Sequence, residues 1–183
     1  MSETDTDRAT WTFLADTYWY VTPPDLPALQ FSPDDHVLTW RGDQTVWHIS
    51  GYKNGYFWGV SAVITFDPGE ASGTRASRPR QLSLVGTVSA GGHVQITFIR
   101  GSGLSESITT DFGQMVIVGG EWTFQMQMST ASGTNQLLHW ANMRQTREGD
   151  ASWHKLPGVD DSVPEMLKGA TYPQFDRATG GHD

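Results

Sequence analysis

The chain has 183 residues, a formal net charge of −8 and no cysteine. The absence of cysteine excludes disulfides, thiolate metal sites and cysteine nucleophiles. A surface with this excess of negative charge repels phosphate backbones, so no nucleic-acid partner is expected. No segment approaches the roughly 20 apolar residues of a membrane helix, and the acidic N-terminus does not resemble a signal peptide. We therefore expect a cytoplasmic protein without a membrane partner.

The first predicted elements follow residues 1–9, an acidic tail that we expect to be disordered. Residues 10–15 can form one helical turn, and a leading aromatic segment of this kind can plug one end of a barrel. Strands are predicted over 16–22 and 37–41, which are rich in aromatic and β-branched residues. The prolines between these two segments predict a loop.

Glycine-containing turns divide the middle of the chain into hairpins. Asn54-Gly55 is the strongest of these signals, because a type I′ turn needs positive φ at both positions. Gly91-Gly92 and Gly119-Gly120 repeat the pattern, and a fourth turn is expected near Ser132-Gly133. The predicted strands around these turns are 45–52, 56–66, 81–90, 93–100, 108–118, 121–130 and 136–145.

Two further segments have irregular composition. Residues 67–80 are rich in Gly, Ser, Pro and Arg, which is typical of a lid or a disordered loop. Residues 147–183 form a turn-rich C-terminal extension. Within it, Ser162 and Glu165 have the spacing of a capping box, so one short helix is predicted over 162–168, ended by Gly169.

These elements predict an all-β fold, an up-and-down antiparallel β-barrel of about eight to ten strands over residues 10–146, with one short C-terminal helix. Closing the meander removes its unpaired strand edges. A two-sheet sandwich is the alternative.

The hairpins also sort side chains into two faces, because directly opposed residues share a face. Around Gly119-Gly120, Met115 is expected opposite Phe124, and the same apolar face includes His139 opposite Met126. Around Asn54-Gly55, one inward face is predicted with the members Trp47, Ile49, Gly51, Trp58, Val60, Ala62 and Ile64. A single β-bulge would exchange these faces.

An inward face that mixes aromatics, methionines and glycines can leave room for a hydrophobic small molecule. The opposite face is rich in glutamine, which suits an oligomer interface, including a homodimer, or a polar ligand lining if the faces are reversed. The alternative for the inward face is a solid core, and the alternative for the glutamine-rich face is a set of uncharged residues that face solvent. The predicted ligand-binding residues are Trp58, Met115, Trp122, Phe124, Met126, Gln114 and Gln125.

The predicted catalytic residues are His139, Asp111 and Tyr20. A histidine in an apolar cavity tends toward its neutral form, which suits a general base, and Asp111 lies on the same predicted face. Alternatively, His139 is a core histidine bonded to the backbone and Asp111 lies at the rim. The histidines lack metal-binding spacing, and Gly101-Ser-Gly103 lacks the context of a dinucleotide loop, so no cofactor or metal is expected.

With strands, turns and tryptophans placed, residues 16–146 resemble the calycin superfamily, which includes the avidin and lipocalin barrels. Asp16-Thr-Tyr-Trp-Tyr20 stands where lipocalins have Gly-x-Trp, so no functional residue is transferred. The acidic, cysteine-free barrel is more loosely similar to small barrel cyclases of actinobacterial polyketide pathways, which implies a shaped cavity without a catalytic motif.

Three functions follow from these observations. The first is a cofactor-independent cyclase or isomerase that folds a hydrophobic, polyketide-like substrate, and the second is a non-catalytic barrel for a hydrophobic ligand. The third is a self-associating interaction module with a filled core. A cavity of roughly 300 Å³ or more would favour the first two over the third.

Overall fold

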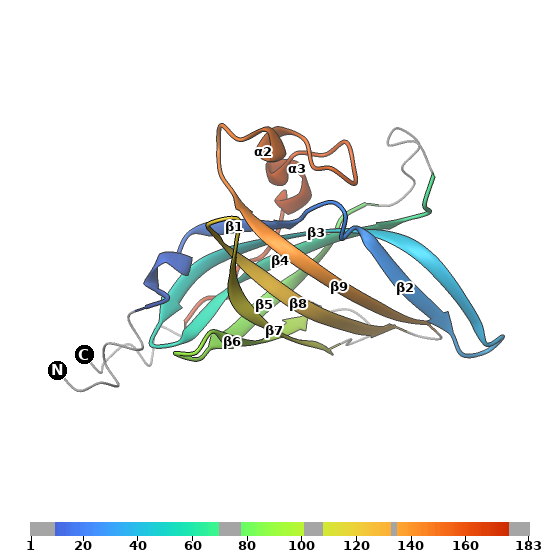
Figure 1. Cartoon of the computed structure of the whole chain (residues 1–183), viewed down its shortest axis with the longest axis horizontal. Coiled ribbons are helices and arrows are strands. Elements are labelled where there is room, and N and C mark those ends of the chain that lie inside the picture. The colour runs from blue at the N-terminus through green and yellow to red at the C-terminus, as the bar shows by residue number, and fades with distance from the viewer. Residues whose placement is uncertain (1–9, 70–77, 101–107, 133–134, 176–183) are drawn as a thin grey trace.

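The computed structural model describes residues 10–69, 78–100, 108–132 and 135–175, so the predicted tail at 1–9 and most of the 67–80 loop lie outside it (Figure 1). The described residues contain nine strands: β1 (Thr17–Val21), β2 (Pro27–Ser32), β3 (Val37–Lys53), β4 (Tyr56–Phe66), β5 (Arg80–Val88), β6 (His93–Ile99), β7 (Ile108–Val118), β8 (Glu121–Ser132) and β9 (Asn135–Thr146). The helical elements are the 3-10 turn η1 (Thr12–Leu14) and the short helices α2 (Ala151–His154) and α3 (Val163–Leu167). In this part of the chain, no helix has the length and apolar character needed to cross a membrane.

The strands close into an antiparallel barrel with eight positions around its wall. Strands β3 to β9 follow one another around the wall, and β1 and β2 share the remaining position between β9 and β3. The predicted all-β barrel is confirmed, its architecture is consistent with a calycin-like barrel, and the sandwich alternative is excluded. Two features were not predicted: β2 lies within the expected proline loop, and β3 joins two predicted strands into one of 17 residues.

The register around Gly119-Gly120 is as predicted. Met115 pairs with Phe124, Gly113 with Met126 and Ile117 with Trp122. In the next hairpin, however, His139 pairs with Met128, and Met126 pairs with Ala141. The predicted pairing of His139 with Met126 is therefore wrong by one inward position.

The predicted inward face around Asn54-Gly55 is wrong because of a β-bulge between Ile49 and Gly51. Gly59 pairs with Ile49, and a Cβ on Gly59 would lie only 1.8 Å from the carbonyl oxygen of His48. The missing side chain lets the two backbones approach, and the bulge moves the rest of the hairpin to the other face. Trp47 and Ile49 point inward, whereas Val60, Ala62 and Ile64 lie on the outer face. Gly51 and Trp58 do pair as expected.

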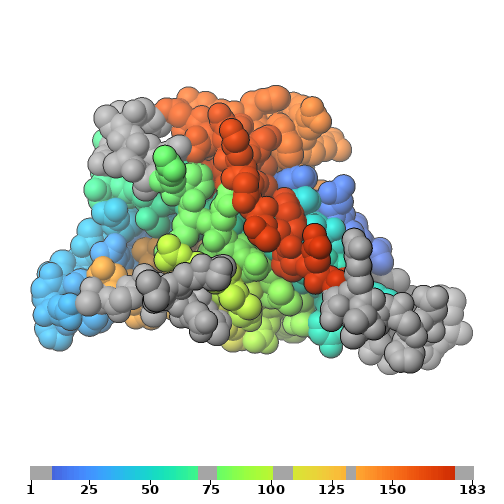
Figure 2. Space-filling view, turned by 180° about the vertical axis from the view of Figure 1, so that it is seen from behind, coloured from blue at the N-terminus to red at the C-terminus, as the bar shows by residue number. Residues whose placement is uncertain are grey.

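The C-terminal extension covers this outer face (Figure 2). Leu156, Val163 and Met166 are completely buried against the apolar side chains of β3 and β4. The capping box of Ser162 and Glu165 is present at the start of α3, as predicted, while α2 was not anticipated. The fold therefore has a second core outside the barrel, which explains why both sides of β4 are apolar.

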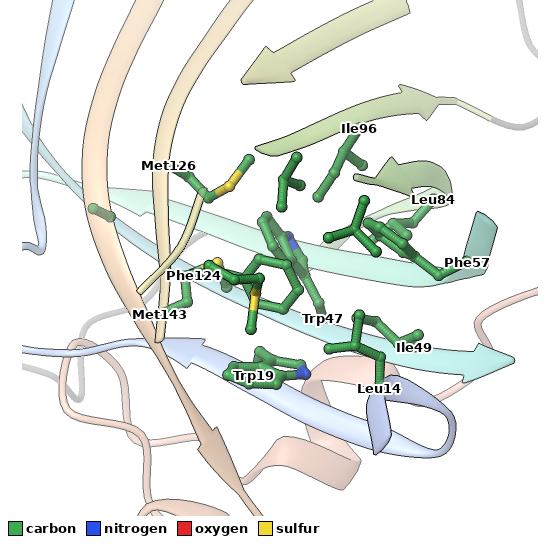
Figure 3. Close-up of a cluster of buried hydrophobic side chains, with 14 of the residues drawn as sticks. Leu14, Trp19, Trp47, Ile49, Phe57, Leu84, Ile96, Phe124, Met126 and Met143 are labelled. Atoms are coloured by element: carbon green, nitrogen blue, oxygen red, sulfur yellow. The ribbon is translucent and has the colours of Figure 1, made fainter. Parts of the chain in front are cut away.

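The barrel interior is packed at the end near η1 (Figure 3). The ring centroid of Phe124 lies 4.6 Å from that of Trp19 and 5.5 Å from that of Trp47. The expected plug is present, because Trp11 and Leu14 are buried in the same cluster. Trp11 is also fixed by donating its Nε1–H to the carbonyl oxygen of Ser89 at 2.8 Å.

Candidate functional site

The opposite end of the barrel interior is polar and holds a cavity of about 40 Å³. This volume has room for a few water molecules, or for one compact functional group. Seven strands contribute to the wall, and Trp47 separates the cavity from the packed interior. We call this site the polar chamber; its polar members are Asp43, Thr45, Ser61, Arg80, Thr109, Asp111, Thr130 and His139.

His139 is held between two groups in the chamber wall. Its Nε2–H donates to the carbonyl oxygen of Asp25 at 2.6 Å, and its Nδ1 lies 3.5 Å from Oδ1 of Asp43. Burial lowers the pKa of His139, but the interaction with the Asp43 carboxylate, the hydrogen bond to Asp25 and the charge of Asp25 outweigh it, so the pKa is raised overall. The surroundings therefore stabilise the imidazolium form relative to an ordinary histidine, whereas the sequence suggested a shift toward the neutral form. The hydrogen bond to the backbone is the one anticipated for a core histidine.

Asp43 supplies the negative charge opposite His139. It is 4% exposed, and its Oδ1 accepts a hydrogen bond from the hydroxyl of Thr45 at 2.6 Å. Asp43, Thr45 and Trp47 alternate along β3, so all three point into the barrel. The bond from Thr45 fixes the carboxylate orientation that His139 meets.

Asp111 is the carboxyl group of the chamber whose pKa is raised most above its ordinary value. Burial raises its pKa to about 7, and the charge of Asp43 adds to this increase. The backbone N–H of Ser129, which donates to Oδ1 at 3.1 Å, and the nearby His139 act in the opposite direction. A carboxyl group that is half-ionised near neutral pH can both accept and return a proton.

Three nitrogens in the chamber wall have no hydrogen-bond partner among the described residues: Trp47 Nε1, Arg80 Nε and His139 Nδ1. A buried donor without a partner costs roughly 1 to 3 kcal/mol, and such groups are rare in native proteins. All three side chains line the same cavity, so an acceptor inside it, a water molecule or a ligand, lies beside all three.

Arg80 also lines a second, outer pocket of about 450 Å³ together with Arg78 and Arg100. The described lining of this pocket contains no Asp or Glu side chain. Arg80 therefore connects the polar chamber to a positively charged surface on a chain whose net charge is −8.

Of the three predicted catalytic residues, His139 and Asp111 lie together in the chamber. Tyr20 lies elsewhere, because its ring packs in the outer cluster beneath the C-terminal extension. The structure thus brings two of the three together and separates the third from them by the barrel wall.

The predicted ligand-binding residues lie in three other places. Met115, Phe124 and Met126 belong to the packed interior, and Trp122 packs against Trp11 at the plugged end, with ring centroids 4.9 Å apart.

The remaining three lie on the outside of the barrel. Trp58 contacts Phe175, at a ring-centroid distance of 4.9 Å. Gln114 donates through Nε2 to Oε1 of Gln125 at 3.3 Å, and Gln125 donates in turn to Asn142 at 3.5 Å.

Sequence reasoning missed Asp43, Arg80 and the role of Trp47 as a donor. In a continuous strand, alternation from Trp47 through Thr45 places Asp43 on the inward face. The two separate strands predicted over 37–41 and 45–52 left Asp43 between them, so its inward position was not recognised. Arg80 was assigned to the loop. Among the described residues, no three His, Cys, Asp or Glu side chains gather in a way that could hold a metal ion.

Comparisons of the chain with models of protein families, with curated proteins and with solved structures find no match.

Proposed function

We propose that this barrel binds a small molecule through the polar chamber and moves a proton within it, as a cofactor-independent isomerase. The observation that carries the proposal is the pairing of Asp111, with a pKa of about 7, and His139, with a raised pKa, around one cavity. A carboxyl group with a pKa near neutrality beside a histidine whose pKa is raised by carboxylates is suited to acid–base catalysis.

The reaction class follows from the two charge states. Ionised Asp111 takes a proton from a carbon next to a carbonyl group, and the electron pair moves to the carbonyl oxygen. The Nδ1–H of protonated His139 stabilises this enolate oxygen by hydrogen bonding. When a C=C bond lies next to that carbon, the enolate is a conjugated dienolate, and Asp111 returns the proton to its far end. The double bond moves by one position, and no oxidant or reductant is needed.

The size of the chamber restricts the ligand. Folding of a long, polyketide-like chain needs a cavity of roughly 300 Å³ or more, whereas the chamber has about 40 Å³. We therefore propose an isomerase that acts on a compact reacting group, in place of the expected cyclase that folds a long substrate.

Deuterium exchange tests the proposal with acetone and pyruvate, whose methyl protons are next to a carbonyl group. In D₂O, NMR should show faster loss of methyl protons with the protein than with buffer. General acid–base groups contribute roughly 100-fold or more, so Asp111→Asn should lower the exchange rate by about that factor. Equal rates for the protein, Asp111→Asn and His139→Gln with both probes would contradict the proposal.

A second candidate function is self-association through the outer face of β7, β8 and β9. Phe112 and Trp140 are 55% and 49% exposed there, and Trp40 nearby is 63% exposed. Exposed aromatic side chains of this kind are enriched at protein interfaces. Analytical ultracentrifugation should then show a dimer that dissociates in Trp140→Ser, with Trp153→Ser in the C-terminal extension as the control. A monomer at all concentrations would contradict this candidate.

A further inference from the structure

We infer that the ligand of the polar chamber is an organic acid whose carboxylate binds to Trp47, Arg80 and His139. This inference rests on the proposed function and names the substrate class of the same site. The carboxylate is then the carbonyl-containing group next to the reacting carbon, so the oxygen that His139 stabilises during proton transfer belongs to it. Two independent observations carry it: the three unpartnered donors inside the chamber and the arginine pocket outside it.

The donors inside the chamber match an anion better than a neutral group. Trp47 Nε1 can only donate, Arg80 is always charged, and Nδ1 of the favoured imidazolium also donates. Trp47 is completely buried and His139 is 4% exposed, so neither can satisfy its free N–H with bulk water. A carboxylate provides two oxygens with about four acceptor positions, which is enough for all three donors.

The charge balance supports the same conclusion. Asp43 neutralises one of the two cations, Arg80 and His139, and Asp111 is half-protonated near neutral pH. An entering carboxylate meets the remaining cation, which balances its negative charge. After binding, the positive charges of Arg80 and His139 are balanced by the negative charges of Asp43 and the ligand carboxylate.

The outer pocket supplies an electrostatic route to the chamber. Arg78 and Arg100 are exposed beside Arg80. None of the three lies within ion-pair distance of a carboxylate of the described residues, although the charge of Asp43 acts on Arg80. Guanidinium groups suit carboxylates, and a basic pocket on an acidic protein concentrates anions locally. Because Arg80 borders both spaces, the outer pocket lies next to the chamber and raises the local concentration of anions beside it.

Acetate and acetamide test the inference, because they have nearly the same shape and differ in charge. The readout is the indole Nε1–H resonance of Trp47 in ¹⁵N-labelled protein, assigned by its loss in Trp47→Phe. At constant ionic strength, acetate should shift this resonance saturably, with a dissociation constant about tenfold below that of acetamide.

Variants separate the two observations. Arg80→Gln should remove the preference for acetate. The double variant Arg78→Gln/Arg100→Gln leaves the chamber intact and should weaken acetate several-fold at low salt, with little effect at high salt. Arg147→Gln, at an exposed arginine outside both spaces, is the matched control and should change neither. Near-UV circular dichroism verifies the fold of each variant.

The outcomes distinguish this inference from the proposed function. If acetamide binds as tightly as acetate, the ligand is a neutral acceptor, so the inference is wrong and the proposed function stands. If neither probe shifts the Trp47 resonance, the chamber does not admit a ligand and both are contradicted. Acetate binding that survives Arg80→Gln unchanged would also overturn the inference.

Discussion

The imidazole of His139 faces the carboxylate of Asp43 at 3.5 Å inside the barrel, and both side chains are almost completely buried. This distance is an ion-pair distance that is longer than a hydrogen bond. The pair therefore sets the charge of His139 mainly through electrostatic attraction, while the bond to Asp25 fixes the ring.

Removing the charge of Asp43 should lower the pKa of His139. Burial lowers the pKa of His139, and in Asp43→Asn only Asp25 remains to raise it. The imidazole should therefore lose its proton at a lower pH than in the native protein. The Cε1–H resonance of His139 in an NMR titration measures this change. Asp16→Asn is the control, because Asp16 contacts His48 at 3.1 Å and should affect that histidine instead. An unchanged titration of His139 in Asp43→Asn would refute the role of the pair.

Asp111 should make the protein less stable as the pH rises. Its pKa of about 7 in the folded protein exceeds the ordinary value of 3.8, so the unfolded chain releases this proton first. The contribution of protonated Asp111 to the free energy of unfolding is fully present below pH 4 and is lost as the pH rises toward and through 7. Between pH 5 and 8 the free energy of unfolding should fall by roughly 2 to 3 kcal/mol. Urea unfolding should show this loss in the native protein and a smaller one in Asp111→Asn. Parallel pH dependences of the two proteins would show that Asp111 has an ordinary pKa.

Gly59→Ala should destabilise the barrel by about 1 to 3 kcal/mol or more, because the new Cβ would collide with the carbonyl oxygen of His48 in the bulge. Thermal unfolding measures the effect. Gly91→Ala is the matched control, since the nearest atom to its added Cβ lies 3.9 Å away. A melting temperature for Gly59→Ala equal to that of the control would mean that the bulge is absent.

Leu156→Ala should cost about 2 to 5 kcal/mol, since Leu156 is completely buried in the cluster outside the barrel. Ile117→Ala, at a side chain that is 62% exposed, should stay within about 0.5 kcal/mol of the native protein. Chemical denaturation compares the two variants. Similar small losses in both would show that the C-terminal extension does not form a second core.

The hairpins could be predicted because Asn54-Gly55 and Gly119-Gly120 combine positive φ with flanking strands of alternating polarity. The bulge beside Gly59 could not be predicted, because the alternation of residues in one strand does not show how closely the backbone of the partner strand approaches. The apolar outer face of β4 misled the face assignment for a related reason. Its covering residues, such as Met166, come from a segment about 100 positions later in the chain.

The chamber was only partly predictable for a different physical reason. Counting along two adjacent hairpins places His139 and Asp111 inside the barrel, and both lie there, although His139 pairs with Met128 rather than with Met126. Asp43 and Arg80 come from strands on other parts of the wall, and only closure of the sheet brings them to the same cavity. Closure of the sheet also brings the apolar side chains around Phe124 together at one end of the barrel and the polar side chains together at the other.

The proposed acid–base pair is tested most directly by an NMR pH titration of the Asp111 carboxyl carbon in selectively ¹³C-labelled protein, with Asp111→Asn used for assignment. We expect a midpoint at about 7 for Asp111, and a midpoint for His139 above the ordinary histidine value in the same protein. A midpoint for Asp111 near the ordinary value of 3.8 would contradict the proposed acid–base pair.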